Sequence, residues 1–442
     1  MRARAALFLV VTVTMLAMAG STAGAQIFSQ TFVVDSTADT GDATPDGLCD
    51  TCTLREAIQE ANANNNPAEV DLIEFSLGAS GVATIFPSSP LPTITQAVDI
   101  NGYSAPGASQ NTTAVGDNAD LRIRLDGDAM GGIPAGLRIS AANCLVRGLS
   151  ITRFGGSGIE AFGPAADSNT IMGNFVGITP GGKDRGNGKG VVIASGASDN
   201  IVGGTTRQAR NIISGNGPSP NFTSSGVDIF SMNMPTTGNE VQGNYIGTDK
   251  SGTGDLGNTG RGVVVYDGAS NTTIGDDNPA NGSGEANIIA FNGFEGVAIL
   301  DGTGNGILSN SIFSNGRLGI DLGGNGVTPN DTRDTDTGPN NLQNKPAITS
   351  ARTGPTNTII EGTLRSIPDE DFTLQFFKNP EDNNDEGKSF IGQKSVSTDA
   401  DGVITFTFRP GQKVRVGKFI TATATHASDT SEFSAPKLVR RR

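Results

Sequence analysis

Short runs of alternating apolar and polar residues recur through the middle of the chain. Each run begins with Gly, continues with a branched apolar residue, and usually has another apolar residue two positions later. β-Branched residues with a period of two predict short strands, and self-similarity at spacings of 23 to 36 residues predicts a solenoid. The six copies start at Gly158, Gly190, Gly226, Gly262, Gly296 and Gly319.

A second repeated signature is Asn-x4-Asn. Each repeat contains about three strand-like runs, and no segment with the period of a helix lies between them. Asn suits tight corners, because it tolerates left-handed backbone geometry and can hydrogen-bond along a stack. Three strands per turn joined by Gly and Asn corners predict a parallel β-helix over residues 67–322. The Asn pairs start at Asn169, Asn211, Asn239, Asn287, Asn305 and Asn310.

The alternation within one run predicts which side chains face the interior. Val227 and Ile229 are expected to be buried, while Asp228 between them points outwards. Longer repeats carry insertions that we expect at the corners of the coils. The insertions cover residues 179–189, 205–210, 247–261 and 276–286.

The first residues predict export. Arg2 and Arg4 precede an apolar run and an Ala-x-Ala site that ends at Ala25, the pattern of a secretory signal peptide over residues 1–25. No later segment is apolar enough to span a bilayer. We therefore expect a secreted, extracellular or cell-surface protein, with the periplasm as another destination.

Residues 26–66 contain the one stretch that reads as a helix. Thr53 and Glu56 fit a capping box, and Leu54, Ala57 and Ile58 fall on one face. A solenoid needs a cover over its first coil, and a short amphipathic helix would supply it. Glu56 is therefore expected to stabilise the helix rather than to act in catalysis.

Two of the three cysteines, Cys49 and Cys52, form a C-x-x-C just before this helix. Redox activity or half of a zinc site are the alternatives, but the chain is exported and lacks a second Cys pair. A local disulfide is the preferred interpretation. Cys144 is expected to be a small buried residue.

A family resemblance rests on these segments. "DGLCDTCTLREAIQEAN" resembles the N-terminal motif of bacterial secreted proteins named for Cys-Ser-Leu-Arg-Glu-Ala (CSLREA), with Thr53 in the Ser position. "GNYIGTDKSGTGDLGNTGRGV" and "NIIAFNGFEGVAI" are similar to the right-handed parallel β-helix, a pectate-lyase-like fold, that follows this motif. The resemblance covers about residues 32–345 and implies an architecture. It implies no activity, because the family has none in common.

The repeat pattern stops after Leu322. Residues 323–346 are rich in Gly, Asn and Asp and read as a linker. From Ala347 to the end, six or seven alternating strands predict an antiparallel β-sandwich of immunoglobulin-like type. The terminal Arg440–Arg442 reads as a solvated basic tail.

Charge and composition exclude several functions. The net charge is −14, which makes nucleic acid and anionic membranes poor partners. The single histidine, His426, has no suitable neighbours for a catalytic triad or a multi-histidine zinc site. With no Trp and three Tyr, glycan binding would depend on Asn, Asp and Gly-rich loops. A monomer is expected.

A polysaccharide lyase or glycoside hydrolase is the alternative function, because many β-helices have such activities. One ladder carries Glu160, Asp228 and Asp321, but stacking would separate Glu160 from Asp228 by about 10 Å. That is too far for a retaining pair and at or beyond the limit for an inverting one. The ladder acids read as solvated. The other weak catalytic candidates, Lys183, Asp184 and Arg185, cluster in one insertion.

The linker contains a candidate calcium site. Asp331, Asp334, Asp336 and Asn340 offer oxygen ligands on a Gly-containing loop, although the spacing is not that of an EF-hand. An acidic linker without a metal is the competing interpretation. Taken together, the sequence predicts an exported protein with a binding, adhesive or structural role towards an extracellular polysaccharide or another cell-surface ligand.

Overall fold

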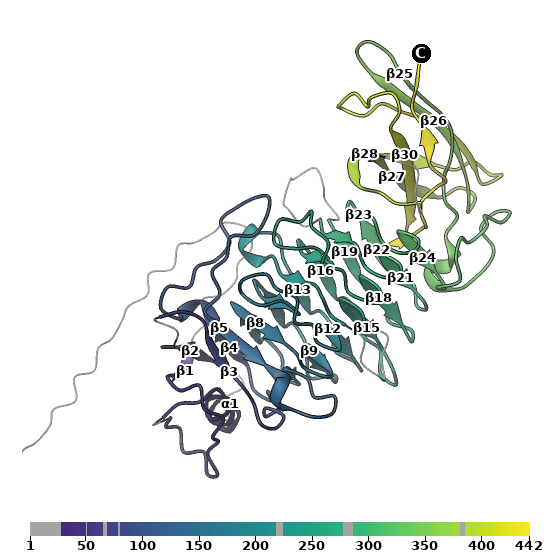
Figure 1. The fold of residues 1–442 in the computed structure, drawn as a ribbon. Helices are drawn as coiled ribbons and strands as arrows, with labels where there is room; N and C mark the ends of the chain where they lie inside the picture. Colours follow the sequence, from purple (N-terminus) through teal and green to yellow (C-terminus); the bar gives the residue numbers. More distant parts are fainter. Residues whose placement is uncertain are drawn as a thin grey trace, which may run out of the picture.

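The computed structural model describes residues 28–49, 51–64, 69–77, 80–217, 224–276, 286–380 and 385–442. The predicted signal peptide lies outside these residues. An elongated stack of coils runs from helix α1 (Leu54–Ala63) at one end to a separate β-rich part at the other (Figure 1). No helix in the described ranges has the length and apolar character that a membrane span requires.

Three long parallel sheets form the stack, and from residue 98 to residue 322 each circuit of the chain adds one strand to each sheet, as in a parallel β-helix. Sheet A contains β1 (Phe28–Val34), β2 (Val70–Phe75), β4 (Val98–Asn101), β7 (Leu145–Arg147), β10 (Thr170–Met172), β13 (Ile201–Gly203), β16 (Glu240–Gln242), β19 (Thr273–Gly275) and β22 (Gly306–Leu308). Sheet B contains β3 (Ala83–Ile85), β5 (Ile123–Asp126), β8 (Leu149–Thr152), β11 (Phe175–Val176), β14 (Ile212–Ile213), β17 (Tyr245–Ile246), β20 (Ile288–Ala290) and β23 (Ser311–Phe313). Sheet C contains β6 (Leu137–Ile139), β9 (Ser157–Phe162), β12 (Lys189–Ala194), β15 (Val227–Phe230), β18 (Val263–Tyr266), β21 (Val297–Ile299) and β24 (Ile320–Leu322).

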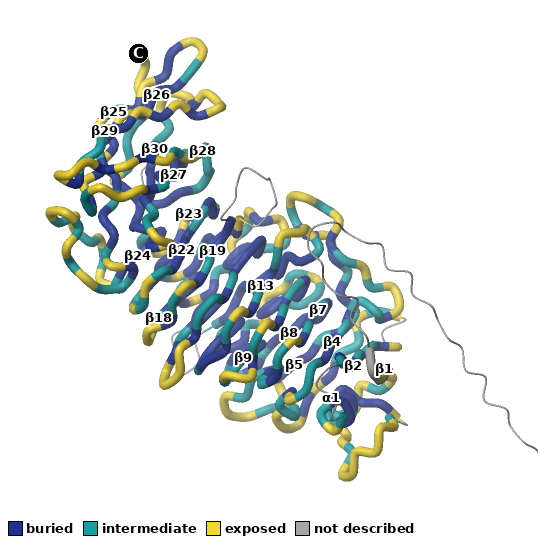
Figure 2. Tube along the Cα trace, turned by 180° about the vertical axis from the view of Figure 1, so that it is seen from behind, coloured by how far each residue is buried: buried dark blue, intermediate teal, exposed yellow. Residues whose placement is uncertain are grey.

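The six glycine-led runs all belong to sheet C, in consecutive coils. Val227 and Ile229 are fully buried, as predicted, and the apolar core is continuous from Phe32 to Phe433. Buried segments recur along the whole stack (Figure 2). The leading glycine is required by close packing between coils. A Cβ on Gly190 would lie only 2.2 Å from the carbonyl oxygen of Gly226 in the next coil.

The predicted Asn corners form three buried ladders. Within an Asn-to-Asn step, the side-chain oxygen of one residue accepts hydrogen bonds from the Asn of the preceding coil. The side-chain nitrogen also donates to a backbone carbonyl, as from Asn244 to Val202 at 2.8 Å. Buried backbone groups at each corner are thereby satisfied. The first ladder contains Asn169, Asn200 and Asn239, and in later coils Asn305 and Asn340. The second contains Asn174, Asn211, Asn244, Asn287 and Asn310. The third contains Asn187, Asn216, Asn258, Asn292 and Asn315.

The N-terminal helix closes the first coil, but the solenoid starts earlier than residue 67. β1 pairs in parallel with β2, so the chain forms one strand of sheet A before it turns into the helix. Leu54, Ala57 and Ile58 are buried in the same core as the solenoid interior. The helical spacing of these residues therefore has the packing role predicted for a cap.

Four short 3-10 turns complete the described solenoid and the segment that follows it. They are η1 (Gly102–Ser104), η2 (Gly127–Ala129), η3 (Arg207–Ala209) and η5 (Pro339–Leu342). The insertions over residues 179–189 and 247–261 form equivalent small hairpins on sheet B, closed by the bridges Ile178–Asp184 and Thr248–Asp255. They cover a small second core around Phe175.

The C-terminal part has two mainly antiparallel sheets that share one apolar core. Its predicted immunoglobulin-like type stays a prediction. The tail is paired rather than free, because Arg440 and Arg441 lie beside β25, although their side chains are exposed. The strands are β25 (Ala347–Thr353), β26 (Thr358–Arg365), β27 (Asp371–Asn379), β28 (Ser389–Ser397), β29 (Val403–Phe408), β30 (Phe419–His426), β31 (Asp429–Thr430), β32 (Lys437–Leu438) and β33 (Arg440–Arg441).

This C-terminal part also covers the last coil. Phe377 and Phe433 belong to the solenoid core, and the Glu386 carboxylate accepts from the backbone amides of Ser314 and Asn315 at the end of one Asn ladder. The segment predicted as a linker is integrated as well, because Asn340 lies in another ladder. The solenoid is therefore covered at both ends.

The helix cap supports a stability prediction. Thr53 is fully buried, its hydroxyl oxygen accepts from the Glu56 amide at 3.1 Å, and the hydroxyl donates to Thr40 at 2.5 Å. Among the described residues, no hydrogen bond joins the Glu56 carboxylate to the Thr53 amide. Thr53→Ala should therefore lower the free energy of unfolding by about 1–2 kcal/mol, whereas Glu56→Ala should change it by less than about 0.5 kcal/mol. Urea denaturation compares the two, and equal effects would contradict this assignment.

Candidate functional site

The outer face of sheet C carries the predicted acidic ladder. The strand registers align Arg138, Glu160, Val192, Asp228, Val264, Ala298 and Asp321 in consecutive coils. Glu160 and Asp228 are thus two coils apart, as the sequence predicted. That spacing separates them by about 10 Å along the stack.

Two of the three acids are buried rather than solvated, which corrects the sequence-based expectation, and Glu160 is half-buried. Asp228 and Asp321 are each only 2% exposed. Asp228 forms an ion pair with Lys189, and the Tyr266 hydroxyl lies 3.4 Å from its carboxylate. Asp321 accepts from the Gly326 amide, in the loop that follows β24. Neighbouring coils and loops cover positions that strand alternation alone assigns to solvent.

Burial sets the protonation behaviour of the ladder. Burial raises the pKa of Asp228 above its ordinary value, and the Lys189 ammonium opposes that shift without cancelling it. Glu160 pairs with Arg138 at 3.4 Å, and burial likewise raises its pKa against the opposing charges of Arg138 and Lys189. Both carboxylates are therefore engaged by a basic side chain.

An aromatic ladder runs beside the charged one. The registers align Phe162, Ala194, Phe230 and Tyr266 two positions further along the same strands. The rings of Phe230 and Tyr266 stack with centroids 4.7 Å apart, and the Arg138 guanidinium lies 4.2 Å over Phe162. This ladder was not predicted from the sequence, because only Trp and Tyr were considered as sugar-binding platforms and the phenylalanines were not aligned between coils.

A groove of about 490 Å³ lies against part of both ladders, which contribute Arg138, Glu160, Val192 and Phe230 to its lining. Its floor comes from β6, β9, β12 and β15, so it runs along the stack across consecutive coils. Its lining residues are Pro90, Leu91, Thr93, Ile133, Pro134, Ala135, Arg138, Gly156, Ser157, Glu160, Lys189, Val192 and Phe230. The groove therefore combines aromatic and aliphatic surface with a few charged groups, as ligand sites generally do.

The N-terminal cap positions part of the groove wall. Arg55 donates to the carbonyls of Ser89 and Pro90 at 2.8 and 2.9 Å, and both ends of its guanidinium bond Asp39 at 3.0 Å. Burial alone would raise the pKa of Asp39, but hydrogen bonds from Arg55 and Ser88 hold it below its ordinary value. Arg55 of the motif thus links the helix to the wall of the groove.

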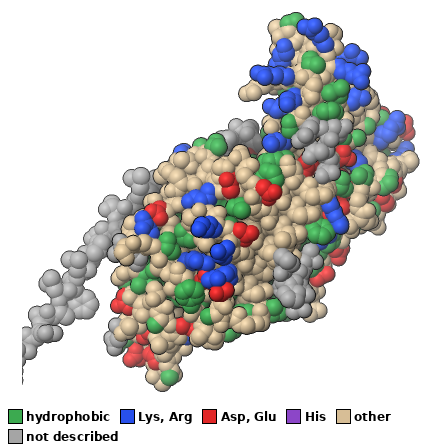
Figure 3. Space-filling view, in the orientation of Figure 1, with side chains coloured by type: hydrophobic (Ala, Val, Ile, Leu, Met, Phe, Trp, Pro, Cys, Tyr) green, Lys and Arg blue, Asp and Glu red, His purple; other side chains and the backbone are tan. Residues whose placement is uncertain are grey.

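The remaining catalytic candidates lie elsewhere. Lys183, Asp184 and Arg185 are exposed in the insertion between β11 and β12, and Asp184 accepts from the Gly186 amide of the same turn. None of the three lines the groove. On the face of Figure 1, Lys and Arg side chains gather near the middle with Asp and Glu around them, so the charge there is mixed (Figure 3).

The three aspartates of the predicted calcium site do converge, and their oxygens lie within 4.8 Å of one another. Asp334 is already engaged by Gln343, Asn344 and Ser366, and burial raises its pKa to about 6. Asn340 is not part of the cluster, because its side-chain oxygen accepts from the Asn305 amide. Calcium binding at this loop stays a prediction.

The cysteines behave as structural residues. Cys49 and Cys52 form a disulfide, and Cys144 is free and 2% exposed, with burial raising the pKa of its thiol to about 12. His426 is half-buried and packs against Phe372. These side chains lie outside the groove.

Comparisons with known proteins add no assignment. No protein-family model matches the chain, and no curated protein matches it. The resemblance to the CSLREA family therefore stays a prediction based on residues 46–62 and the repeats.

Proposed function

We propose that this chain is an exported binding protein that holds an extended extracellular polysaccharide in the sheet C groove. The observation that carries the proposal is the pair of parallel ladders, one aromatic and one charged, along the axis of the stack. Aromatic faces pack against the apolar faces of sugar rings, while charged groups orient hydroxyl and carboxylate groups. An axial groove suits a linear polymer, since equivalent side chains repeat from coil to coil.

The arrangement favours binding over cleavage. A glycosidase needs two carboxyl groups about 5–10 Å apart that are free to exchange protons. Glu160 and Asp228 are two coils apart, and each is paired with its own base. A lyase of the calcium-dependent kind needs clustered acids, and the groove lining contains a single acid, Glu160. A lyase or hydrolase remains the alternative that the binding experiment also tests.

Removal of the aromatic ladder should weaken binding. Phe230→Ala should lower the affinity for the bound polysaccharide by about tenfold or more, because Phe230 lines the groove and buried aromatic contacts dominate such interfaces. Tyr266 stacks on Phe230 from outside the groove lining, so Tyr266→Ala should weaken binding less than Phe230→Ala does. Isothermal titration calorimetry against a panel of acidic and neutral extracellular polysaccharides gives the affinities. Unsaturated-product absorbance and reducing-end assays on the same mixtures report any cleavage.

Phe294→Ala is the matched control, because Arg317 lies 4.3 Å over the Phe294 ring but this ring does not line the groove. The control should bind like the unmodified protein. Equal binding by all three variants would exclude the groove as the site. Steady release of unsaturated or reducing ends would replace the binding proposal by the enzyme alternative.

A further inference from the structure

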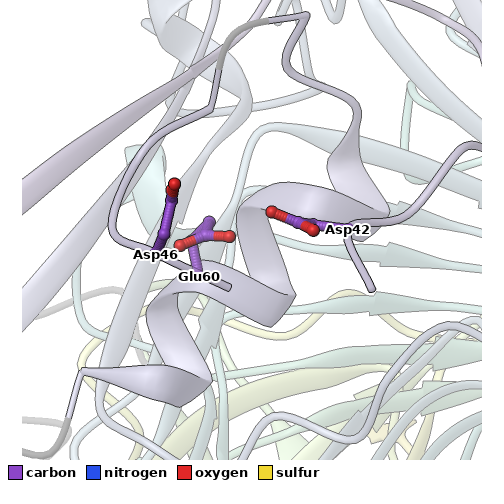
Figure 4. A group of neighbouring side chains, drawn as sticks. All are labelled: Asp42, Asp46 and Glu60. Carbon is purple, nitrogen blue, oxygen red and sulfur yellow. The ribbon is translucent and has the colours of Figure 1, made fainter. Parts of the chain in front are cut away.

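A second cluster of three carboxylates lies where the loop before α1 meets that helix, and none of the three lines the groove. Asp42 and Asp46 come from the loop between β1 and α1, and Glu60 comes from α1. Their oxygens lie within 4.8 Å of one another, and the Glu60 carboxylate sits between the two aspartates (Figure 4). The sequence analysis did not single out these residues, because no simple spacing joins the loop to the helix.

The loop is fastened to the helix by its backbone. The Asp42 amide donates to Gln59 at 2.8 Å, and the Gln59 side chain donates back to the Asp42 carbonyl at 2.9 Å. The Gly47 amide donates to Glu60 Oε2 at 2.6 Å, and the disulfide Cys49–Cys52 joins the loop to the helix start. These contacts hold the three carboxylates in a defined arrangement.

One oxygen of the buried Glu60 carboxylate has no partner that would replace the water lost on burial. The residue is 1% exposed, and its Oε1 has no hydrogen-bond partner. Buried charges are normally paired with an opposite charge or a metal. The charged groups that act on Glu60 are Asp42 and Asp46, both acidic, and the nearest arginine of the helix, Arg55, is engaged by Asp39.

The aspartates still have oxygens to offer. Asp42 Oδ1 accepts from Thr44, and Asp46 Oδ1 accepts from Leu48, each within its own turn. In the described ranges, no hydrogen bond reaches the Oδ2 atom of either residue. Three carboxylates can therefore each turn an oxygen towards one point.

We propose that Asp42, Asp46 and Glu60 bind a Ca²⁺ ion that locks the loop over helix α1. Ligand oxygens on opposite sides of a calcium ion are about 4.8 Å apart, twice the usual bond length of about 2.4 Å, and the oxygens of this cluster lie within that distance of one another. All the ligands are hard oxygens, and the nearby thiols are held in the disulfide, so zinc and softer metals are disfavoured. The open side of the loop leaves room for water ligands, since Asp46 is exposed.

Calcium titration of the full chain in chelator-treated buffer tests this site. Calorimetry should detect binding with a dissociation constant between about 1 μM and 1 mM, which spans the weaker sensor sites and the extracellular calcium modules. Calcium should also raise the melting temperature and slow hydrogen exchange over residues 39–49. Glu60→Gln and Asp46→Asn should each weaken binding at least tenfold and remove both calcium effects.

The paired variant Asp331→Asn/Asp336→Asn separates this site from the aspartate cluster near the C-terminal part. Its calcium affinity and its exchange protection over residues 39–49 should match those of the unmodified chain. Loss of all binding in this variant would place the ion at the other cluster and overturn the proposal. Absence of binding up to about 10 mM Ca²⁺, or unchanged binding by Asp46→Asn, would also overturn it. Asp46 is exposed, so this variant remains informative even if Glu60→Gln does not fold.

Discussion

Replacement of Asn244 by Ala should lower the free energy of unfolding by about 3–5 kcal/mol, because several buried hydrogen bonds are lost at once. Asn244 is fully buried in the middle of its ladder. Its Oδ1 accepts from Asn211 Nδ2 at 2.9 Å, and its Nδ2 donates to Val202 and to Asn287 at 2.8 and 3.0 Å. Alanine would leave these partners buried without hydrogen bonds.

Urea denaturation followed by far-UV circular dichroism measures the change. Asn325→Ala is the control, because Asn325 is exposed in the loop after β24 and should change the stability by less than about 0.5 kcal/mol. A comparable effect at the two positions would mean that the ladder contributes little. A broadened transition in the Asn244 variant would indicate that the coils above and below it unfold separately, as nearest-neighbour coupling in a solenoid permits.

The repeat signals were sufficient to predict the solenoid. Gly190 and its equivalents mark the places where two backbones approach too closely for a side chain, and the Asn pairs mark the corners of each coil. Both signals are local and recur in the coils from residue 158 onwards, so the same pattern predicts many strands. β1 was missed because a loop and a helix separate it from β2, its neighbour in the sheet.

The candidate site was predicted less well, because it depends on register between coils. The sequence placed Glu160 and Asp228 on one ladder correctly, but it could not show that Lys189 and Tyr266 cover Asp228. Alignment of the sheet C strands by their leading glycines would have shown Phe162, Phe230 and Tyr266 at one position. Asn340 was wrongly assigned to a metal site. The composition of its loop gave no sign that an Asn ladder of the solenoid continues into that loop through Asn305.

Lys189→Ala should lower the free energy of unfolding by about 3–5 kcal/mol at pH 7, because it leaves the buried Asp228 carboxylate without its counter-ion. The penalty should depend on pH. Burial holds the pKa of Asp228 in the folded protein above its value in the unfolded chain. At pH values above the folded pKa, the ionised carboxylate therefore destabilises the folded state. As the pH falls through that pKa, Asp228 takes up a proton and the penalty is lost. Urea denaturation of both proteins at a series of pH values from 7 downwards measures both effects.

A double variant separates stability from function at the same position. Val192 and Val264 flank Asp228 in the ladder, so Lys189→Met with Asp228→Val places an apolar pair where apolar residues already pack. Its stability should lie within about 1 kcal/mol of the unmodified protein, as for other buried ion pairs replaced by apolar residues. Polysaccharide binding should nevertheless weaken, since Lys189 lines the groove. A stable double variant with full binding would mean that the ion pair has no part in recognition, and the aromatic ladder alone would define the site.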